Sequence, residues 1–321
     1  MRRLPLLIAL MFALVAGCGD DGSSGDGEGG APAPVTLKVG VIPIADVAPL
    51  YLGMDKGFFE EEDLTLEPQL AEGGAAIVPS VISGDYQIGF SNTTSLIIAG
   101  SKGLPIQIVS QGVLGGTGPD DAWDGVIVPE GSDVEDVGGL EGKTVAVNTL
   151  NNVSQVVINT ALDEAGADYT KVKYVEVPFP DMNAALESGR VDAAFQVEPG
   201  YSGGLAAGST NILNAYEAMA PNYTVATYFA SEQYIAENRD VVDRFVRAMQ
   251  KSLDYAASND DEARAIVATY TEIPQEVIDV MNLPVWKADL NEPTIEQTVE
   301  AASRYGFIEE PPSLDELILR D

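Results

Sequence analysis

The sequence contains no histidine and a single cysteine, and each shortage excludes a class of site. Without histidine there can be no Ser-His-Asp or Cys-His nucleophile system and no histidine-based metal site. The one cysteine, Cys18, cannot form an internal disulfide or a cysteine metal cluster. We therefore expect no metal and no cofactor. Carboxylates could still perform acid–base catalysis, but no closely spaced pair facing inward stands out, and we expect a protein that is not an enzyme.

Basic residues are also scarce, since 17 Lys and Arg stand against 50 Asp and Glu, a formal net charge of −33. Nucleic acid is not an expected partner, because phosphate binding needs clustered lysines and arginines. The excess of carboxylates is typical of a highly soluble surface. The alternative is an electrostatic field that attracts cationic ligands.

The length of 321 residues and the hydrophobic content of 45% allow about two domains with a substantial core. Two stretches in it resemble one another, Ser83–Phe90 and Ser188–Phe195, 188 − 83 = 105 positions apart. Each consists of a Ser-Gly turn followed by a short apolar strand that ends in Phe. Lys38–Val41 is likewise echoed by Thr144–Val147, 106 positions later. These repeats predict two related α/β lobes.

The N-terminus has the features of a lipoprotein signal peptide. Arg2 and Arg3 precede the apolar run Leu4–Val15, which is too short to span a bilayer. The stretch that ends at Cys18 resembles a bacterial lipobox, so we expect a signal peptide at 1–17 and a lipid on Cys18. An ordinary signal peptide that happens to contain a cysteine is the alternative. Residues 18–34, rich in Gly, Ser, Asp and Pro, predict a flexible tether.

The remaining chain alternates short apolar runs with helical patterns, which favours βαβ units and largely parallel sheets. The expected strands are Val35–Val41, Leu64–Pro68, Tyr86–Phe90, Ile106–Val109, Gly125–Val128, Lys143–Val147, Val172–Val177, Val191–Phe195 and Thr224–Ala230. The expected helices are Ala48–Gly57, Ala75–Ser83, Ser95–Gly100, Val153–Ala165, Asp181–Ser188 and a helical tail from Glu232 onward. Ligands bind such sheets at the carboxyl ends of the strands.

Four segments give the chain a resemblance to a known family. They are Pro43–Phe59, Ser83–Asp85 with Ile88–Gly89, Asp136–Val147, and Val191–Ala194 followed by Glu198-Pro199. In their order and spacing the chain resembles the ABC-transporter solute-binding lipoproteins of the nitrate/sulfonate/taurine/thiamine-precursor (pyrimidine) branch. The resemblance covers nearly the whole chain after the tether.

The resemblance implies a two-lobed, type II-like periplasmic-binding-protein fold. Each lobe would be a mainly parallel α/β sheet flanked by helices, with two hinge crossings. The first lobe would comprise 35–110 and the second 111–225, and 226–321 would form the return hinge and a helical tail that completes the first lobe. The implied partners are a small molecule and a membrane permease with its ATPase. We expect a monomer, anchored by lipid outside the cytoplasmic membrane.

The candidate ligand-binding residues lie in loops at predicted strand ends. They are Asp46, Tyr51, Gly73, Gly74, Asn92, Thr93, Trp123, Asn151, Asn152, Gln196, Glu198 and Tyr201. The helix N-termini among them would expose unpaired backbone N–H groups, which suit an anion. Plain helix capping would require the same Asn and Thr side chains, so both interpretations stay open.

Several of these residues have a structural alternative of their own. Asp46 either caps its helix or faces the ligand, and Tyr51 belongs either to the core or to the wall of the site. Trp123 either stacks on a flat ligand or packs in the hinge. Glu198, with Tyr201 near it, either accepts a hydrogen bond from a ligand amine or ties down its own loop.

None of the candidate loops contains Arg or Lys, so bidentate recognition of an anion is unsupported. Acidic residues are common there instead, namely Asp46, Asp120, Asp121, Asp124 and Glu198. This balance favours a neutral or amine-bearing heteroaromatic ligand, such as a pyrimidine precursor of thiamine or a flavin-like ring. The alternatives are a sulfonate-, taurine- or nitrate-type anion held by helix N-termini, and a ligand sensor for a membrane receptor. An enzyme on the same fold is less expected, because the enzymes related to this family depend on histidine.

Overall fold

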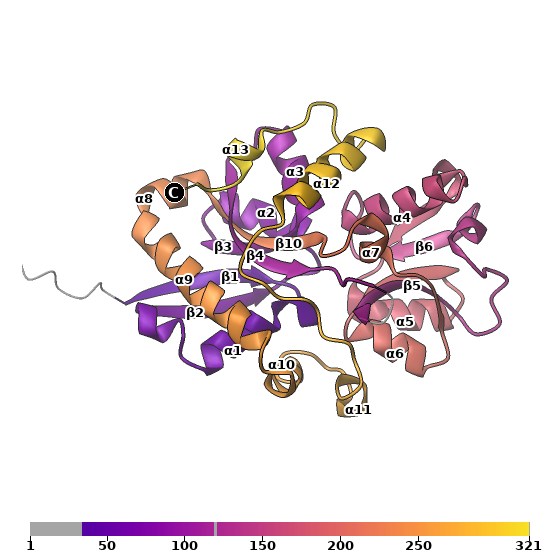
Figure 1. Cartoon of the computed structure of the whole chain (residues 1–321), viewed down its shortest axis with the longest axis horizontal. Helices are drawn as coiled ribbons and strands as arrows, with labels where there is room; N and C mark the ends of the chain where they lie inside the picture. The colour runs from indigo at the N-terminus through magenta and orange to yellow at the C-terminus, as the bar shows by residue number, and fades with distance from the viewer. Residues whose placement is uncertain (1–33, 119–120, 321) are drawn as a thin grey trace, which may run out of the picture. The chain divides into compact units, whose positions relative to one another are not determined.

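The computed structural model describes residues 34–118 and 121–320. The expected signal peptide, the lipid attachment at Cys18 and all of the tether except Pro34 lie outside the described residues. Within the described ranges, no helix is long and apolar enough to cross a membrane. The chain from Pro34 onward contains two β-sheets, each flanked by helices (Figure 1).

The first sheet has the strand order β2-β1-β3-β10-β4. Its strands are β1 (Val35–Val41), β2 (Leu64–Leu70), β3 (Ile88–Asn92), β4 (Ile106–Leu114) and β10 (Thr224–Ser231). β10 runs antiparallel to both of its neighbours, and the other four strands share one direction. β4 continues to Leu114, beyond the boundary expected at residue 110.

The second sheet repeats this arrangement, in the order β7-β6-β8-β5-β9. Its strands are β5 (Asp124–Val128), β6 (Thr144–Val147), β7 (Lys173–Glu176), β8 (Ala193–Val197) and β9 (Thr210–Leu213). Here β5 takes the antiparallel place that β10 has in the first sheet. We call the two sheets with their helices the first lobe and the second lobe.

The strand register reproduces the repeat seen in the sequence. Val39 of β1 pairs with Ile88 of β3 in the first sheet, and Val145 of β6 pairs with Ala193 of β8 in the second. These partners are 106 and 105 positions apart, the offsets of the two sequence echoes. The shared topology and register confirm two related α/β lobes, although each sheet is mixed rather than wholly parallel.

Helices flank both sheets, and a helical tail returns along the first one. The first lobe contains η1 (Ala45–Val47), α1 (Ala48–Asp55), η2 (Glu60–Glu62), α2 (Gly74–Ile82) and α3 (Thr93–Ser101). The second contains η4 (Val137–Leu140), α4 (Val153–Glu164), η5 (Tyr169–Lys171), α5 (Phe179–Glu187), α6 (Gly200–Ala206) and α7 (Ala215–Met219). The tail contains α8 (Glu232–Glu237), α9 (Arg239–Ala256), α10 (Asp260–Val267), α11 (Gln275–Ile278), α12 (Glu292–Arg304) and α13 (Leu314–Leu317).

The long helix α9 shows why the tail joins the first lobe. Apolar residues recur on one side of it, and Val242, Phe245 and Met249 are fully buried. This stripe packs over α1, as an amphipathic helix does when it covers a core. Arg247 adds an ion pair to Glu62 of η2, with Nη2 2.6 Å from Oε2.

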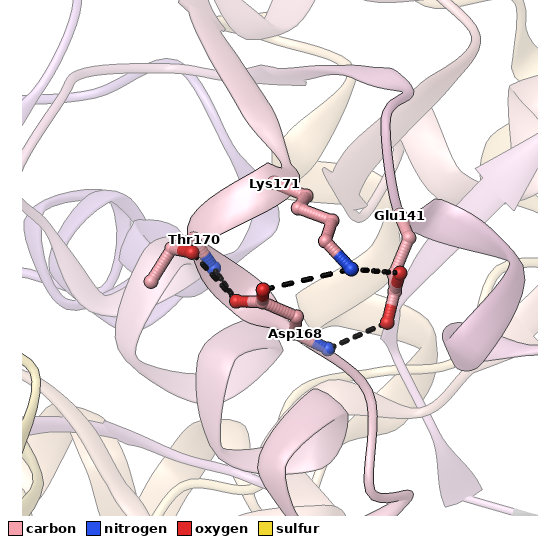
Figure 2. A network of polar contacts seen from close by, with 4 residues as sticks. All are labelled: Glu141, Asp168, Thr170 and Lys171. Atoms are coloured by element: carbon pink, nitrogen blue, oxygen red, sulfur yellow. Dashed lines mark hydrogen bonds and ion pairs between the residues drawn. The ribbon is translucent and has the colours of Figure 1, made fainter.

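A small polar network fixes a corner of the second lobe (Figure 2). Lys171 Nζ lies 2.8 Å from Glu141 Oε2, and the backbone N–H of Asp168 donates to Glu141 Oε1 at 2.7 Å. Thr170 Oγ1 donates to Asp168 Oδ1 at 2.6 Å. The hydrogen bond to Glu141 raises the pKa of Lys171. Because the network is largely exposed, its contribution to stability is small, and it serves to connect η5 to the loop before β6.

Candidate ligand site between the lobes

A small, partly open cavity lies where the strand ends of the two lobes meet. The first lobe contributes Ile42, Ile44, Asp46, Phe90, Asn92, Val225 and Ala226, and the second contributes Asn148, Val153, Ser154, Phe179, Val197 and Tyr216. Its volume of about 20 Å³ is enough for a single water molecule and far too small for an aromatic ring. A ligand with an aromatic ring therefore enters only if the two lobes move apart.

Asp46 is the charged residue among the described residues that line this cavity. It lies in η1, is only 3% exposed, and its Oδ1 has no hydrogen-bond partner. Burial raises its pKa to about 7. The N-cap of α1 is Val47, and no side chain caps this helix, so Asp46 is not the capping residue. A buried carboxyl oxygen without a hydrogen-bond partner is costly, so a donor placed beside Oδ1 would stabilise it.

The second lobe offers hydroxyl and amide groups to the same cavity. Ser154, in the first turn of α4, is 1% exposed and its Oγ has no partner. Asn152 is the N-cap of α4 and accepts from the Ser154 backbone N–H at 3.1 Å. Its Nδ2 donates to Asn148 Oδ1 at 2.7 Å, and Asn148 Nδ2 in turn donates to the Glu72 carbonyl of the first lobe at 3.3 Å. This chain of amides orients Asn148 at the cavity wall.

Aromatic and aliphatic side chains form most of the remaining wall. Phe90 comes from β3, Phe179 from the start of α5 and Tyr216 from α7, and Val197 ends β8. The Tyr216 ring lies 5.1 Å from the ring of Trp123 and 5.5 Å from that of Phe195. The cavity therefore combines an apolar, partly aromatic wall with a few polar groups, as small-molecule sites do.

The predicted residues of the first lobe are brought close to this cavity to different degrees. Asn92 lines it and also caps α3, with Oδ1 accepting from the Ser95 N–H at 2.9 Å. Thr93 is buried and donates from Oγ1 to the Thr224 carbonyl at 2.9 Å, which ties α3 to β10. Gly73 and Gly74 allow close packing around the cavity because they lack a Cβ. A Cβ on Gly74 would come within 2.0 Å of Ser91 Oγ, and one on Gly73 within 2.6 Å of Thr149 Cγ2 in the second lobe.

Glu198 is buried behind the cavity and ties its own loop. Its Oε1 accepts from Ser202 Oγ at 2.6 Å and from the Asn282 N–H at 3.2 Å, and its Oε2 accepts from the Ser202 N–H at 3.0 Å. Burial raises its pKa to about 7. Its backbone carbonyl accepts from the Ala45 N–H of the first lobe at 2.9 Å. Glu198 thus contacts the opposite lobe through its backbone and the tail through its side chain.

Five other predicted residues do not line the cavity, and each is held by structural contacts, including the hydrogen bond from the Asn151 N–H to Gln155 Oε1. Gln196 donates from Nε2 to Asn183 Oδ1 at 3.0 Å, and Tyr201 is buried in α6. Trp123 is fully buried and donates from Nε1 to the Leu114 carbonyl at 3.1 Å, which is packing at the first crossing. Tyr51 stacks on Tyr270, with ring centroids 4.0 Å apart. The fifth, Asn151, is exposed and takes a φ of 54° just before α4.

The sequence reasoning missed several lining residues. Asn148 directly follows β6, so its position at a strand end could have identified it. Ser154 is the second residue of α4, a helix whose N-terminus was already expected to face the ligand. Tyr216 and Phe179 had no local signal, since they reach the cavity only through the packing of α7 and α5. Among the described residues, no cluster of acidic, cysteine or histidine side chains could hold a metal.

A family model described as NMT1/THI5 like matches residues 44–263, more than half of the chain. The chain belongs to the NMT1/THI5-like family. This membership confirms the resemblance read from the sequence. The family match contains most of the cavity-lining residues and ends within α10, so the tail beyond residue 263 lies outside it.

The proteins to which this chain is similar include both binding proteins and enzymes. The chain is 25% identical to a formylaminopyrimidine-binding protein of Halalkalibacterium halodurans over 271 residues, covering 84% of this chain and 78% of the relative. It is 24% identical to a 4-amino-5-hydroxymethyl-2-methylpyrimidine phosphate synthase of Aspergillus parasiticus over 222 residues, covering 65% and 62%.

Solved structures of periplasmic binding proteins share the fold. The alkanesulfonate-binding protein SsuA of Xanthomonas axonopodis pv. citri, solved with bound MOPS, superposes with a TM-score of 0.73. The superposition covers 88% of this chain and 96% of SsuA at 16% identity. At that identity the likeness establishes the fold of this NMT1/THI5-like protein, a two-lobed mixed α/β architecture.

Proposed function

We propose that this chain is the extracytoplasmic solute-binding component of an ABC importer and clamps a small organic ligand between its lobes. Family membership and the pyrimidine-binding relative support this assignment. The ligand class we propose is a neutral or amine-bearing heteroaromatic, similar to a pyrimidine precursor of thiamine.

The observation that carries the ligand class is the buried carboxyl of Asp46 at the cavity between the lobes. Its unpaired Oδ1 needs a hydrogen-bond donor, which an exocyclic amine or a protonated ring nitrogen supplies. None of the described lining residues is Arg or Lys, so the positive partner has to come from the ligand. A charge-assisted bond in such a buried place is stronger than a neutral one.

The other walls fit the remaining features of a small heteroaromatic. Phe90, Phe179 and Tyr216 offer rings against which a flat ligand packs. Ser154 Oγ, unpaired on the opposite lobe, can donate to a ring nitrogen or a carbonyl oxygen of the ligand. A ligand that contacts both Asp46 and Ser154 would hold the two lobes together, which is how such clamps close.

A panel of small molecules tests the ligand class. The probes are 4-amino-5-hydroxymethyl-2-methylpyrimidine, riboflavin, taurine and nitrate, each added to the full chain in a thermal unfolding assay. A ligand at 100 times its Kd adds about 2.7 kcal/mol of stability, which raises the Tm clearly. We expect the aminopyrimidine to give the largest rise. A rise with taurine or nitrate alone would overturn the proposed ligand class and leave the clamp intact.

An anion is the second candidate ligand, and one observation favours it. α4 is twelve residues long, and its N-terminal turn with the unpaired Ser154 Oγ lies at the cavity. Helix N-termini attract negative charge. The carboxyl of Asp46 in the same cavity opposes an anion unless it is protonated, which is why we place the amine-bearing ligand first.

Transport, membrane anchoring and the monomeric state are parts of the same proposal. We propose lipid attachment at Cys18, so that Cys18→Ser should move the protein from the membrane fraction to the soluble fraction. A permease and ATPase that co-purify with the ligand-bound chain would support import, and a receptor kinase in their place would support sensing. An enzymatic role is disfavoured because the sequence has no histidine.

A further inference from the structure

The tail does more than complete the first lobe, because it reaches the second lobe and returns. α10 packs on α1 of the first lobe, and α11 then lies against α6 of the second. α12 packs again on α3 of the first lobe. Between α11 and α12 the chain passes along both hinge crossings. We call residues 281–291, in this passage, the strap.

At its start, the strap is tied to the second lobe. Asn282 donates from Nδ2 to the Ala122 carbonyl at 2.7 Å, next to β5, and its backbone N–H donates to Glu198 Oε1 at 3.2 Å. Arg264 of α10 donates to the Met281 carbonyl and contributes a positive charge near Glu198. The buried carboxyl of Glu198 thus depends on the strap for one of its three donors.

A few residues later, the strap is tied to the first lobe. The Leu114 N–H at the end of β4 donates to the Val285 carbonyl at 2.9 Å. Trp286 is 4% exposed and donates from Nε1 to the backbone carbonyl of Asp46 at 3.2 Å. Near its end the strap also reaches the return crossing, where Lys287 Nζ lies 2.7 Å from Asn222 Oδ1.

The short span between these ties sets a limit on hinge opening. Trp286 lies four positions after Asn282, and a fully extended chain covers at most about 3.6 Å per residue, or about 14 Å between the two Cα atoms. If both ties hold, the Glu198 loop and the Asp46 loop cannot move further apart than this span allows.

We infer that the strap is a third link between the lobes, in which Asn282 and Trp286 are positioning residues that hold the Glu198 and Asp46 loops for ligand binding. The part of this inference that concerns ligand binding rests on the proposed function. The strap itself lies beyond the segment that the family model matches, which ends at residue 263. Removing either tie favours the open clamp and so shortens ligand residence.

The test measures the distance between the lobes in the ligand-free protein. Spin labels are placed on the full chain with Cys18→Ser, at Lys102→Cys in the first lobe and Glu187→Cys in the second, both exposed positions. The variants are Asn282→Ala, which loses the tie to Ala122, and Trp286→Phe, which loses only Nε1 and keeps an aromatic ring. Val280→Ala is the matched control, because Val280 is 69% exposed and lies beside the strap.

We expect both tie variants to show a longer mean distance than wild type, and Val280→Ala to match wild type. Dissociation of 4-amino-5-hydroxymethyl-2-methylpyrimidine should be about threefold to tenfold faster in the tie variants, the cost of one hydrogen bond. Unchanged distances in both variants, even with a lower Tm, would overturn the inference and leave the strap as packing. Because the distances need no ligand, a wild-type protein that binds no probe would count against the proposed ligand and not against the strap.

Discussion

Asn92 ends β3 in the first lobe, and Val197 ends β8 in the second, 105 positions later. Both line the cavity between the lobes, so the duplicated backbone brings the same strand end to the same place twice. One position offers an amide and the other an aliphatic side chain. The difference shows that the repeat sets where a side chain lies, while the residue at that position sets what it can bind.

The two lobes also bring different polar groups to the cavity. The first lobe brings the carboxyl of Asp46 and the amide of Asn92, whereas the described lining residues of the second lobe bring hydroxyl and amide groups, such as Ser154 and Asn148, and no carboxyl. A ligand that matches both sides has a hydrogen-bond donor at one end and an acceptor at the other.

Replacing Asp46 should have the largest effect. Asp46→Asn removes the charge that would hold a ligand amine, and hydrogen bonds to charged groups contribute about 1.5–3 kcal/mol. We expect the affinity for 4-amino-5-hydroxymethyl-2-methylpyrimidine to fall by about tenfold to a hundredfold in calorimetric titration. Ser154→Ala, on the opposite lobe, is the comparison and should cost less. An equal loss in both variants would contradict the division between the lobes.

Stability and affinity should depend on pH in opposite directions. The folded-state pKa of Asp46 is raised from 3.8 to about 7, and that of Glu198 from 4.5 to about 7. In this window the folded protein binds protons that the unfolded chain has released, so the ligand-free stability falls as pH rises toward 7. We expect a higher Tm at pH 5 than at pH 8, measured without ligand.

Affinity for an amine-bearing ligand should rise over the same pH range, because Asp46 must be ionised to pair with the amine. Asp46→Asn should flatten this rise in affinity and leave the Glu198 part of the stability change. A pH-independent affinity in the wild-type protein would show that the carboxyl does not pair with the ligand.

The two helix caps provide a closer comparison. Asn92 caps α3 and lines the cavity, whereas Asn152 caps α4 and does not line it. Loss of an N-cap costs about 0.5–2 kcal/mol, so Asn92→Ala and Asn152→Ala should lower the free energy of unfolding by similar amounts. Asn92→Ala should weaken ligand binding more, because it removes a lining group, whereas Asn152→Ala acts on the cavity only through the orientation of Asn148. If calorimetric titration shows that Asn92→Ala binds the ligand as tightly as the wild-type protein, Asn92 only caps its helix.

Trp123→Phe should have the smallest effect on binding. Trp123 is fully buried at the first crossing and donates to the Leu114 carbonyl, away from the cavity wall. Loss of this bond should cost about 1 kcal/mol of unfolding free energy and leave the affinity within about threefold. A tenfold loss of affinity, with stability unchanged, would make Trp123 a wall of the site.

Much of the fold was accessible from the sequence because it depends on local patterns. Alternating apolar residues identified β1, and the Ser-Gly turns located β3 and β8 within a residue or two. Asn92 and Asn152 were recognisable as caps because an Asn before an apolar helical run is a local signal. The predicted β4 was too short, because Ser110, Gln111 and Gly112 interrupt its apolar pattern and the strand continues through them to Leu114 by pairing with β10.

The candidate site was only partly accessible, since a cavity depends on contacts between distant segments. Glu198 was a reasonable ligand candidate, but Ser202 and Asn282 satisfy its carboxyl, and Asn282 is 84 positions away. No local sequence pattern identified the strap, because Asn282 and Trp286 act through hydrogen bonds to Ala122 and Asp46, which lie in two other parts of the chain.

Composition and short-range spacing were enough to predict the duplicated α/β plan and to exclude histidine chemistry, because both are properties of the chain before it folds. The packing of distant segments decided which buried carboxyl oxygens are left without a hydrogen-bond partner, and Asp46 Oδ1 is one of them. Asp46 and Glu198 are both buried acids beside predicted strand ends, and they differ only in what the fold brings against them. Packing gives Glu198 three donors and leaves Asp46 Oδ1 facing the cavity, and no local pattern encodes that difference.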